Sequence, residues 1–360
     1  MDEPVKDIER LRREAEEGNP DAQYRLGADY YFGLGVEQDG EEAVRLFRLA
    51  MKQGHKDAEY ILYKQGIGGE MTEENPKDDI KWVRSAAEGG DPKAQAFLGI
   101  CYTYGLAVPH DDAEAVRWYR KSAEQGFAQA QYDLGCCYAF GTGIEKDHSE
   151  AIQGWQLAAE QGLDAAQYNL GLSYGKGDGV EKDLEEAARW YRLAAEQGYP
   201  EAQFMTGCYF DSCKEGEESE REAARWYRLA AEQEHPEAQY SLGICYLVGR
   251  GVPQDHAETA RWYRKAAELG HREAAYDLGC IYADGDGVGQ DKTQAAYWWH
   301  KAAEDGLDLA QGALGLCYLN GDGVEKDLDK AAYWLSLSAD QGIVEAQEAL
   351  DRLERERQAR

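Results

Sequence analysis

With 360 residues, the chain is long for one compact globule, and its hydrophobic residues (43%) are spread evenly along it. No stretch reaches the roughly 18 consecutive apolar residues of a membrane-spanning helix. The chain has 39 Lys and Arg against 69 Asp and Glu, a formal net charge of −30, which argues against nucleic acid and anionic membranes as ligands because both are polyanions.

The amino-terminal stretch MDEPVKDIERLRREAEEG predicts an amphipathic helix. It lacks the basic start and the apolar core of a secretory signal. We therefore expect a cytoplasmic protein.

An alanine recurs every 36 residues, at Ala22, Ala58, Ala94, Ala130, Ala166, Ala202, Ala238, Ala274, Ala310 and Ala346. A fixed period of about 20 to 50 residues is typical of solenoids. We predict one solenoid domain over residues 1–360, with nine repeats in 22–345. Residues 1–21 match only the second half of a repeat and 346–360 only the first half, so both ends are predicted to be caps.

Each repeat shows two helical patterns, which we call helix A and helix B. In repeat five, helix A has apolar residues at helical spacing from Ala166 to Tyr174, and a glycine-rich turn follows. Helix B continues the pattern from Ala187 to Ala195. An aspartate precedes most B helices as a predicted N-cap, at Asp39, Asp111, Asp147, Asp183, Asp255 and Asp291, and a proline opens several A helices, at Pro20, Pro92, Pro200 and Pro236.

A lone two-helix hairpin buries too little apolar surface to fold, so each repeat must pack against its neighbours. The recurrent tryptophans are therefore predicted to pack between helices, at Trp82, Trp118, Trp190, Trp226, Trp262, Trp298 and Trp334.

The turns of repeats two and six depart from the pattern. Their sequences are GGEMTEEN and DSCKEGEES. These departures fit either altered curvature, a partner contact or drift in a tolerant loop.

Residues 166–198 and 274–306 are nearly complete copies of one repeat pattern, A-x-x-x-L-G-x-x-Y-x-x-G-x-G-V-x-x-D-x-x-x-A-x-x-W-Y-x-x-A-A-E-x-G. It resembles the Sel-one-like repeat (SLR) family, a relative of the tetratricopeptide repeats, over essentially the whole chain. The resemblance implies an all-α, right-handed α/α superhelix and the work of an adaptor in quality control, signalling or host-microbe contact. It supplies no shared catalytic motif.

Two short motifs suggest an enzyme. Residues 171–175 match the G-x-S-x-G nucleophile elbow, and Ser173 with Lys176 matches the S-x-x-K of penicillin-interacting serine enzymes. The elbow needs a strand-to-helix turn, whereas Ser173 falls on a predicted helix. We expect no catalytic residue, and a serine hydrolase of this type is kept as the alternative.

The eight cysteines and seven histidines form no metal-binding pattern. Secreted cysteine-rich relatives of the SLR family pair cysteines within each repeat, whereas most repeats here hold one, which indicates free thiols in a reducing compartment. The histidines are predicted to be solvated.

Arginine pairs recur on helix B, as at Arg117 and Arg120. They fit either a solvent-exposed face, where they pair with glutamates four residues later, or a surface that binds an acidic peptide. We expect no metal and no cofactor.

The repeats differ most on one face of helix A, at the positions that match Arg25, Asp29 and Phe32. We take this as the candidate binding face, with an apolar-aromatic cluster in repeats three and four and more polar residues later. The candidate partner-binding residues are Phe97, Tyr104, Asp133, Phe140, Asn169, Lys176 and Tyr209.

The sequence thus predicts a non-enzymatic scaffold or adaptor that binds a protein or peptide on the concave helix A face. The acidity fits a basic partner or a surface that is only soluble and self-repelling. No nucleic acid, membrane or small-molecule substrate is implied. A further alternative is an idealised repeat without an evolved partner.

Overall fold

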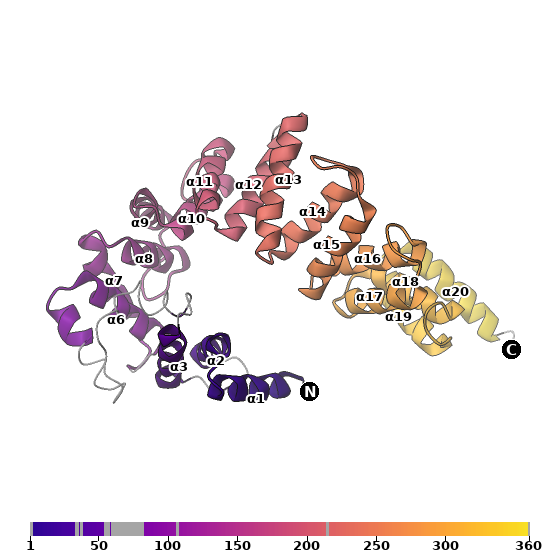
Figure 1. Cartoon of the computed structure of the whole chain (residues 1–360), viewed down its shortest axis with the longest axis horizontal. Coiled ribbons are helices and arrows are strands. Elements are labelled where there is room, and N and C mark those ends of the chain that lie inside the picture. The colour runs from indigo at the N-terminus through magenta and orange to yellow at the C-terminus, as the bar shows by residue number, and fades with distance from the viewer. Residues whose placement is uncertain are drawn as a thin grey trace. The chain divides into compact units, whose positions relative to one another are not determined.

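A computed structural model describes residues 3–32, 36, 39–53, 58, 83–105, 108–213 and 216–358. These residues form helices and turns without a strand among them (Figure 1). The helices are α1 (Glu3–Glu16), α2 (Pro20–Phe32), α3 (Gly40–Lys52), α6 (Pro92–Tyr104), α7 (Asp112–Glu124), α8 (Ala128–Phe140), α9 (His148–Glu160), α10 (Asp164–Lys176), α11 (Leu184–Glu196), α12 (Pro200–Cys213), α13 (Glu217–Glu232), α14 (Pro236–Val248), α15 (His256–Glu268), α16 (Arg272–Asp284), α17 (Lys292–Glu304), α18 (Asp308–Asn320), α19 (Leu328–Asp340) and α20 (Val344–Gln358).

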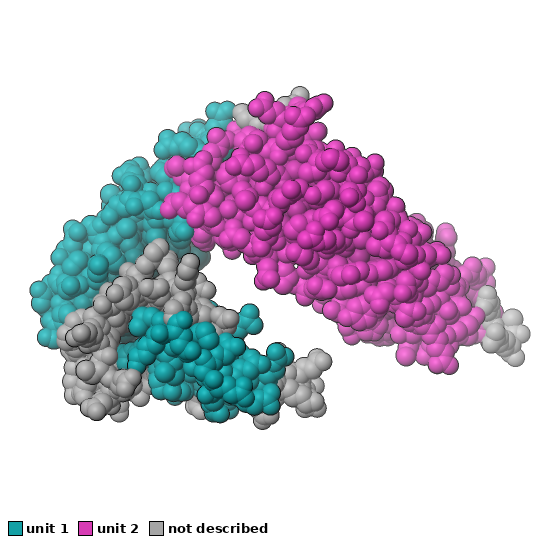
Figure 2. Space-filling view, in the orientation of Figure 1, with its two compact units in different colours: residues 1–190 teal, residues 191–360 magenta. Residues whose placement is uncertain are grey.

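The chain divides into two compact units, residues 1–190 and 191–360 (Figure 2). Within each unit, consecutive helices pack against one another, and the A and B helices of one repeat make the most extensive contacts. This succession of paired helices is an α solenoid, which confirms the predicted fold class. The right-handed superhelix and the single domain of nine repeats stay predictions. Most of repeat two, including Trp82 and its unusual turn, lies outside the described residues.

Local capping chemistry sets the helix starts. The Asp255 side chain accepts hydrogen bonds from the backbone N–H groups of Ala257 and Glu258, both at 3.0 Å, and so satisfies donors that have no partner inside the helix. The same cap forms at each of the predicted aspartates, and also at Asp327 before α19. The predicted prolines open α2, α6, α12 and α14. None of the helices in the described ranges is long and apolar enough to cross a membrane.

The small residues that recur in each repeat allow close packing of the helices. Gly243 of α14 lies against the Tyr263 ring of α15, where an added Cβ would come within 2.5 Å of the ring. Trp190, Trp226, Trp262 and Trp298 are 5–6% exposed, and Trp118 and Trp334 are partly buried against the core. The predicted packing role is therefore confirmed for the tryptophans that the structure describes.

A chain of glutamine side chains links successive helices. Gln203 of α12 donates to the backbone oxygen of Ala195 at 3.2 Å and accepts a hydrogen bond from Gln233 of α13 at 2.8 Å. Equivalent pairs join Gln53 to Gln23, Gln125 to Gln95, Gln161 to Gln131 and Gln341 to Gln311. Buried amides of this kind fix the register of one helix on the next, because a shift leaves them unpaired.

Repeat six differs because its turn lacks the usual pair of glycines. Helix α13 begins at Glu217, ahead of the position at which the other B helices are capped by aspartate. That position holds Ser219, whose hydroxyl instead donates to the Phe210 backbone oxygen at 3.0 Å. The altered turn is thus partly helical. Curvature, partner contact and drift stay open as its explanation.

Candidate binding surface on helix A

The three variable positions of helix A differ in exposure. The position matching Asp29 is the most covered: Cys101, Cys137, Ser173, Cys245, Ile281 and Cys317 are buried there. The position matching Phe32 lies at the end of helix A and is exposed in each described repeat from three to nine, at Tyr104, Phe140, Lys176, Ser212, Val248, Asp284 and Asn320. The surface of this face is therefore made mainly by the helix ends.

Two of these exposed ends are aromatic, and both lie in the first compact unit. Phe140 at the end of α8 is 77% exposed and Tyr104 at the end of α6 is 37% exposed. Phe97, in the same predicted cluster, is only 6% exposed and packs in the core beside Leu98. Phe97 thus contributes to packing, and Tyr104 and Phe140 offer the accessible rings.

Asp133 of α8 is half-buried on this face. Its Oδ1 accepts a hydrogen bond from Gln129 at 3.1 Å, while the buried Oδ2 has no partner in the part of the chain that the structure describes. Burial raises the pKa of Asp133 to about 7. Burial, and then the nearby Asp133 carboxylate, also raise the pKa of Tyr119, whose hydroxyl lies 3.0 Å from Thr103 Oγ1.

The remaining candidates are placed separately. Asn169 is half-buried on α10, and Lys176 is exposed at the end of that helix. Tyr209 is half-buried on α12 in the second compact unit, where it meets the Phe210 ring edge-on at 5.8 Å. Asp133 and Tyr104 both raise the pKa of Tyr119 by their charges, after the larger effect of burial. Tyr209 belongs to the other unit.

The G-x-S-x-G match at residues 171–175 does not form a nucleophile elbow. Ser173 lies inside α10 and is 6% exposed, and Lys176 lies on the same helix. A nucleophile elbow places its serine on a tight turn after a strand, and that geometry does not occur at Ser173.

The cysteines and histidines have structural surroundings. The cysteines whose side chains the structure describes are all free. Among the described residues, no group of three or more His, Cys, Asp or Glu side chains could hold a metal ion. His235 and His271 were predicted to be solvated, and this is wrong. Each accepts a hydrogen bond from a helix N-terminal N–H at 3.2 Å and lies against an aromatic ring, Phe204 or Tyr240.

The arginine pairs of helix B have two different partners. The first arginine pairs with the glutamate three residues earlier, as Arg261 does with Glu258 at 3.0 Å. The second donates to the tyrosine hydroxyl of the next helix A, as Arg228 does to Tyr246 at 2.7 Å. Equivalent bonds join Arg12 to Tyr30, Arg84 to Tyr102, Arg120 to Tyr138 and Arg264 to Tyr282. The recurring spacing of 18 residues was a signal for this link between repeats.

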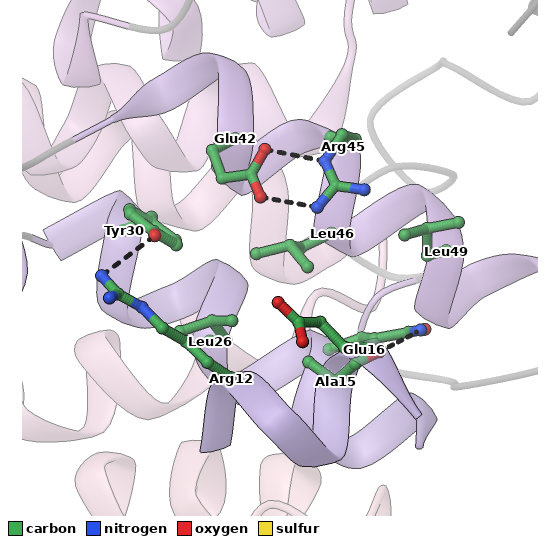
Figure 3. Close-up of a pocket in the computed structure, with 10 residues that line it drawn as sticks. Arg12, Ala15, Glu16, Leu26, Tyr30, Glu42, Arg45, Leu46 and Leu49 are labelled. Atoms are coloured by element: carbon green, nitrogen blue, oxygen red, sulfur yellow. Dashed lines mark hydrogen bonds and ion pairs between the residues drawn. The ribbon is translucent and has the colours of Figure 1, made fainter. Parts of the chain in front are cut away.

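One cavity was not anticipated from the sequence. A space of about 440 Å³ opens between α1, α2 and α3, with Leu46 among its lining residues (Figure 3). The signal was present, since Leu46 occupies the place that holds tryptophan in most other repeats.

Comparison with known proteins follows the repeat boundaries. The model of the Sel1 repeat matches residues 20–55, 92–127, 128–163, 164–199, 200–235, 236–271, 272–307 and 308–343. The chain is similar to a Sel1 repeat protein from Oxalobacter formigenes, at 30% identity over 98% of this chain and 94% of the other, with a TM-score of 0.62.

A second solved structure is c5321, a protective antigen present in uropathogenic Escherichia coli strains and displaying an SLR fold. It is 30% identical over 97% of this chain and 90% of its own, with a TM-score of 0.42. No curated protein matches the chain.

Proposed function

Because this chain belongs to the Sel1 repeat family, we propose that it is a non-enzymatic adaptor that binds a protein or peptide on the exposed ends of its A helices. Sel1-type repeat proteins generally act as protein-interaction scaffolds. The proposal places the strongest contacts at Tyr104 and Phe140, with Asp133, Asn169, Lys176 and Tyr209 as further contacts.

The observation that carries this proposal is the exposure of Tyr104 and Phe140. The position is exposed in every described repeat from three to nine. Among these seven repeats, only α6 and α8 place an aromatic ring there. Aromatic side chains dominate binding hot spots because they bury a large area at a low cost in conformational entropy. A polar residue would satisfy an exposed helix end equally well.

We propose a basic partner. The chain carries a formal net charge of −30, and complementary charge speeds the encounter between proteins. Binding should then weaken as ionic strength rises, because salt screens exposed charges over a Debye length of about 8 Å at physiological ionic strength.

The test is a double variant, Tyr104→Ala with Phe140→Ala. Both side chains are exposed, so the fold should survive, while each loss should weaken partner capture about 30-fold, as expected for a hot spot of about 2 kcal/mol. Capture is measured by affinity purification with mass spectrometry, and circular dichroism checks the fold. Asn320→Ala, at the matching position of α18, is the control.

Retained capture by the double variant would refute the site. If the unmodified chain captures nothing specific, the idealised repeat without a partner is favoured instead. A labelled β-lactam that forms an acyl adduct on Ser173 would favour the serine hydrolase.

We also propose a cytoplasmic location. The free cysteines are the supporting observation, because oxidising compartments favour disulfides. Fractionation of cells that produce the chain, with thiol labelling of each fraction, tests this proposal. Labelled thiols confined to an exported fraction would contradict it.

A further inference from the structure

The cavity between α1, α2 and α3 combines an apolar floor with a charged rim (Figure 3). Leu26 and Leu46 lie at its floor and are buried, at 4% and 2% exposure. Glu42 and Arg45 lie at the rim and bond to one another in a two-pronged ion pair at 2.7 and 2.6 Å. Arg12, on the other side, donates to the Tyr30 hydroxyl at 3.2 Å.

The cavity lies where most other repeats place a tryptophan side chain. Leu46 matches Trp262, six repeats of 36 residues further along the chain. Trp262 is 5% exposed. It shares a buried cluster with Ala231 of α13, helix B of the preceding repeat, and with Leu242 of α14, helix A of its own repeat. Leucine at position 46 reaches less far than an indole, so the corresponding space stays open.

Repeat seven, which has Trp262 at this position, shows which side chains contact an indole here. Trp262 donates its Nε1–H to the Glu258 carboxylate at 3.1 Å, and the Arg261 guanidinium lies 5.3 Å from its ring centroid. These partners match Glu42 and Arg45 of the cavity. The indole N–H groups of Trp190, Trp226 and Trp298 have no hydrogen-bond partner among the described residues, so the acceptor is a feature of repeat seven, whereas an arginine also lies over the rings of Trp190 and Trp226. The first repeat thus keeps the acceptor and the stacking cation of repeat seven without the tryptophan.

We propose that this cavity binds a tryptophan side chain of a partner polypeptide. The Glu42 carboxylate accepts the indole N–H, and the Arg45 guanidinium stacks on the ring. The rim carries two arginines, Arg12 and Arg45, and two glutamates, Glu16 and Glu42, so its formal charges balance. A neutral aromatic group fits such a rim better than an ion does.

The partner is a polypeptide because the cavity, at about 440 Å³, is larger than one indole and leaves room for neighbouring residues. The chain itself presents its indoles from helices, as α15 does with Trp262. The site lies on α1 to α3 and is separate from Tyr104 and Phe140, so its failure would leave the proposed function untouched.

The probe is a synthetic peptide with the sequence of residues 256–268, carrying 5-fluorotryptophan at the position of Trp262. Its fluorine resonance is followed by NMR as the full chain is added. We expect a shifted and broadened signal with the unmodified chain. A peptide with alanine in place of the tryptophan, detected by a terminal fluorine label, should not bind.

Two variants locate the binding. Leu46→Trp restores the missing indole and should weaken peptide binding at least 10-fold by filling the cavity. Glu42→Ala removes the N–H acceptor and should weaken it without filling anything. Leu157→Trp adds a tryptophan at a half-exposed position of α9 and should leave binding unchanged. Circular dichroism checks that each variant is folded.

Free indole is tested in parallel with the peptide. Tighter binding of the peptide than of indole supports a polypeptide partner, and equal binding overturns that part of the proposal. Peptide binding that survives in both Leu46→Trp and Glu42→Ala, or that is equal for the alanine peptide, overturns the site itself.

Discussion

In repeat seven, the buried side-chain oxygen of Gln239 accepts no hydrogen bond among the described residues. The glutamine that would donate to it in other repeats is replaced by Leu269. A buried acceptor without a partner costs about 1–3 kcal/mol, because it loses its water without a replacement bond. This one substitution therefore leaves a buried acceptor unpaired where five other repeats have a glutamine pair.

We predict that Leu269→Gln stabilises the chain by about 1 kcal/mol. Leu269 is 46% exposed, so its replacement loses little apolar burial, and the new amide can donate to Gln239. Urea denaturation followed by circular dichroism measures the change. Asp305→Gln is the matched control, because the facing position holds Ala275 and offers no side-chain acceptor. A lower urea midpoint for Leu269→Gln than for the control would contradict the prediction.

Asp133 makes stability depend on pH. Burial raises its pKa in the folded chain from the ordinary value of 3.8 to about 7, so between these values the folded state binds more protons than the unfolded state. The contribution of this group to stability is therefore fully present below about pH 4. It is lost as the pH rises through about 7.

Asp133→Asn should therefore raise the urea midpoint at pH 8 and change it much less at pH 4. The amide keeps an acceptor for Gln129 but carries no charge to be buried. The unmodified chain at both pH values is the reference. An equal shift of the midpoint at the two pH values would show that charge burial at Asp133 is not the cause.

At the scale of the element, the turn after helix A joins one repeat to the preceding one. In repeat nine, Gly321 and Gly323 have φ of +83° and +71°, which side chains other than glycine adopt only with strain. A Cβ at Gly323 would also lie 1.9 Å from the backbone oxygen of Lys292, at the start of the preceding helix B. The turn is thus a packing surface as well as a connection.

We predict that Gly323→Ala destabilises the chain by at least about 2–3 kcal/mol, since the positive φ costs about 1 kcal/mol and the backbone clash adds to it. The control is Gly289→Ala, where an added Cβ would meet no atom within 4 Å. Thermal unfolding of both variants measures the difference. Equal melting temperatures would show that the turn does not pack as described.

At the scale of the whole molecule, the features predicted well from the sequence are local ones. The Asp255 cap and the start of α14 at Pro236 depend on a few neighbouring residues, so their patterns suffice. The exposure of the candidate surface depends on the next repeat. Phe97 and Asn169 occupy the same position of helix A, yet the first is buried and the second half-buried. Periodicity gives the face of a helix but not what covers it.

Because each repeat contacts only its neighbours, damage at one end should spread over a limited distance. Helix α20 covers the end of the second compact unit. Its Leu353 is 1% exposed and packs with Leu319 and Ala331, and its Ala346 packs with Leu335. Deletion of residues 344–360 would expose these apolar side chains of α18 and α19 to water.

We therefore predict that this deletion raises amide hydrogen exchange strongly in α18 and α19 and only slightly in α14 and α15. Each step along the array adds an intact interface that must also open before exchange can occur. Mass spectrometry of peptic fragments measures the profile, and a chain shortened by only residues 359–360 is the control. A uniform rise from α12 to α19 would instead show that the second compact unit unfolds as a single cooperative block.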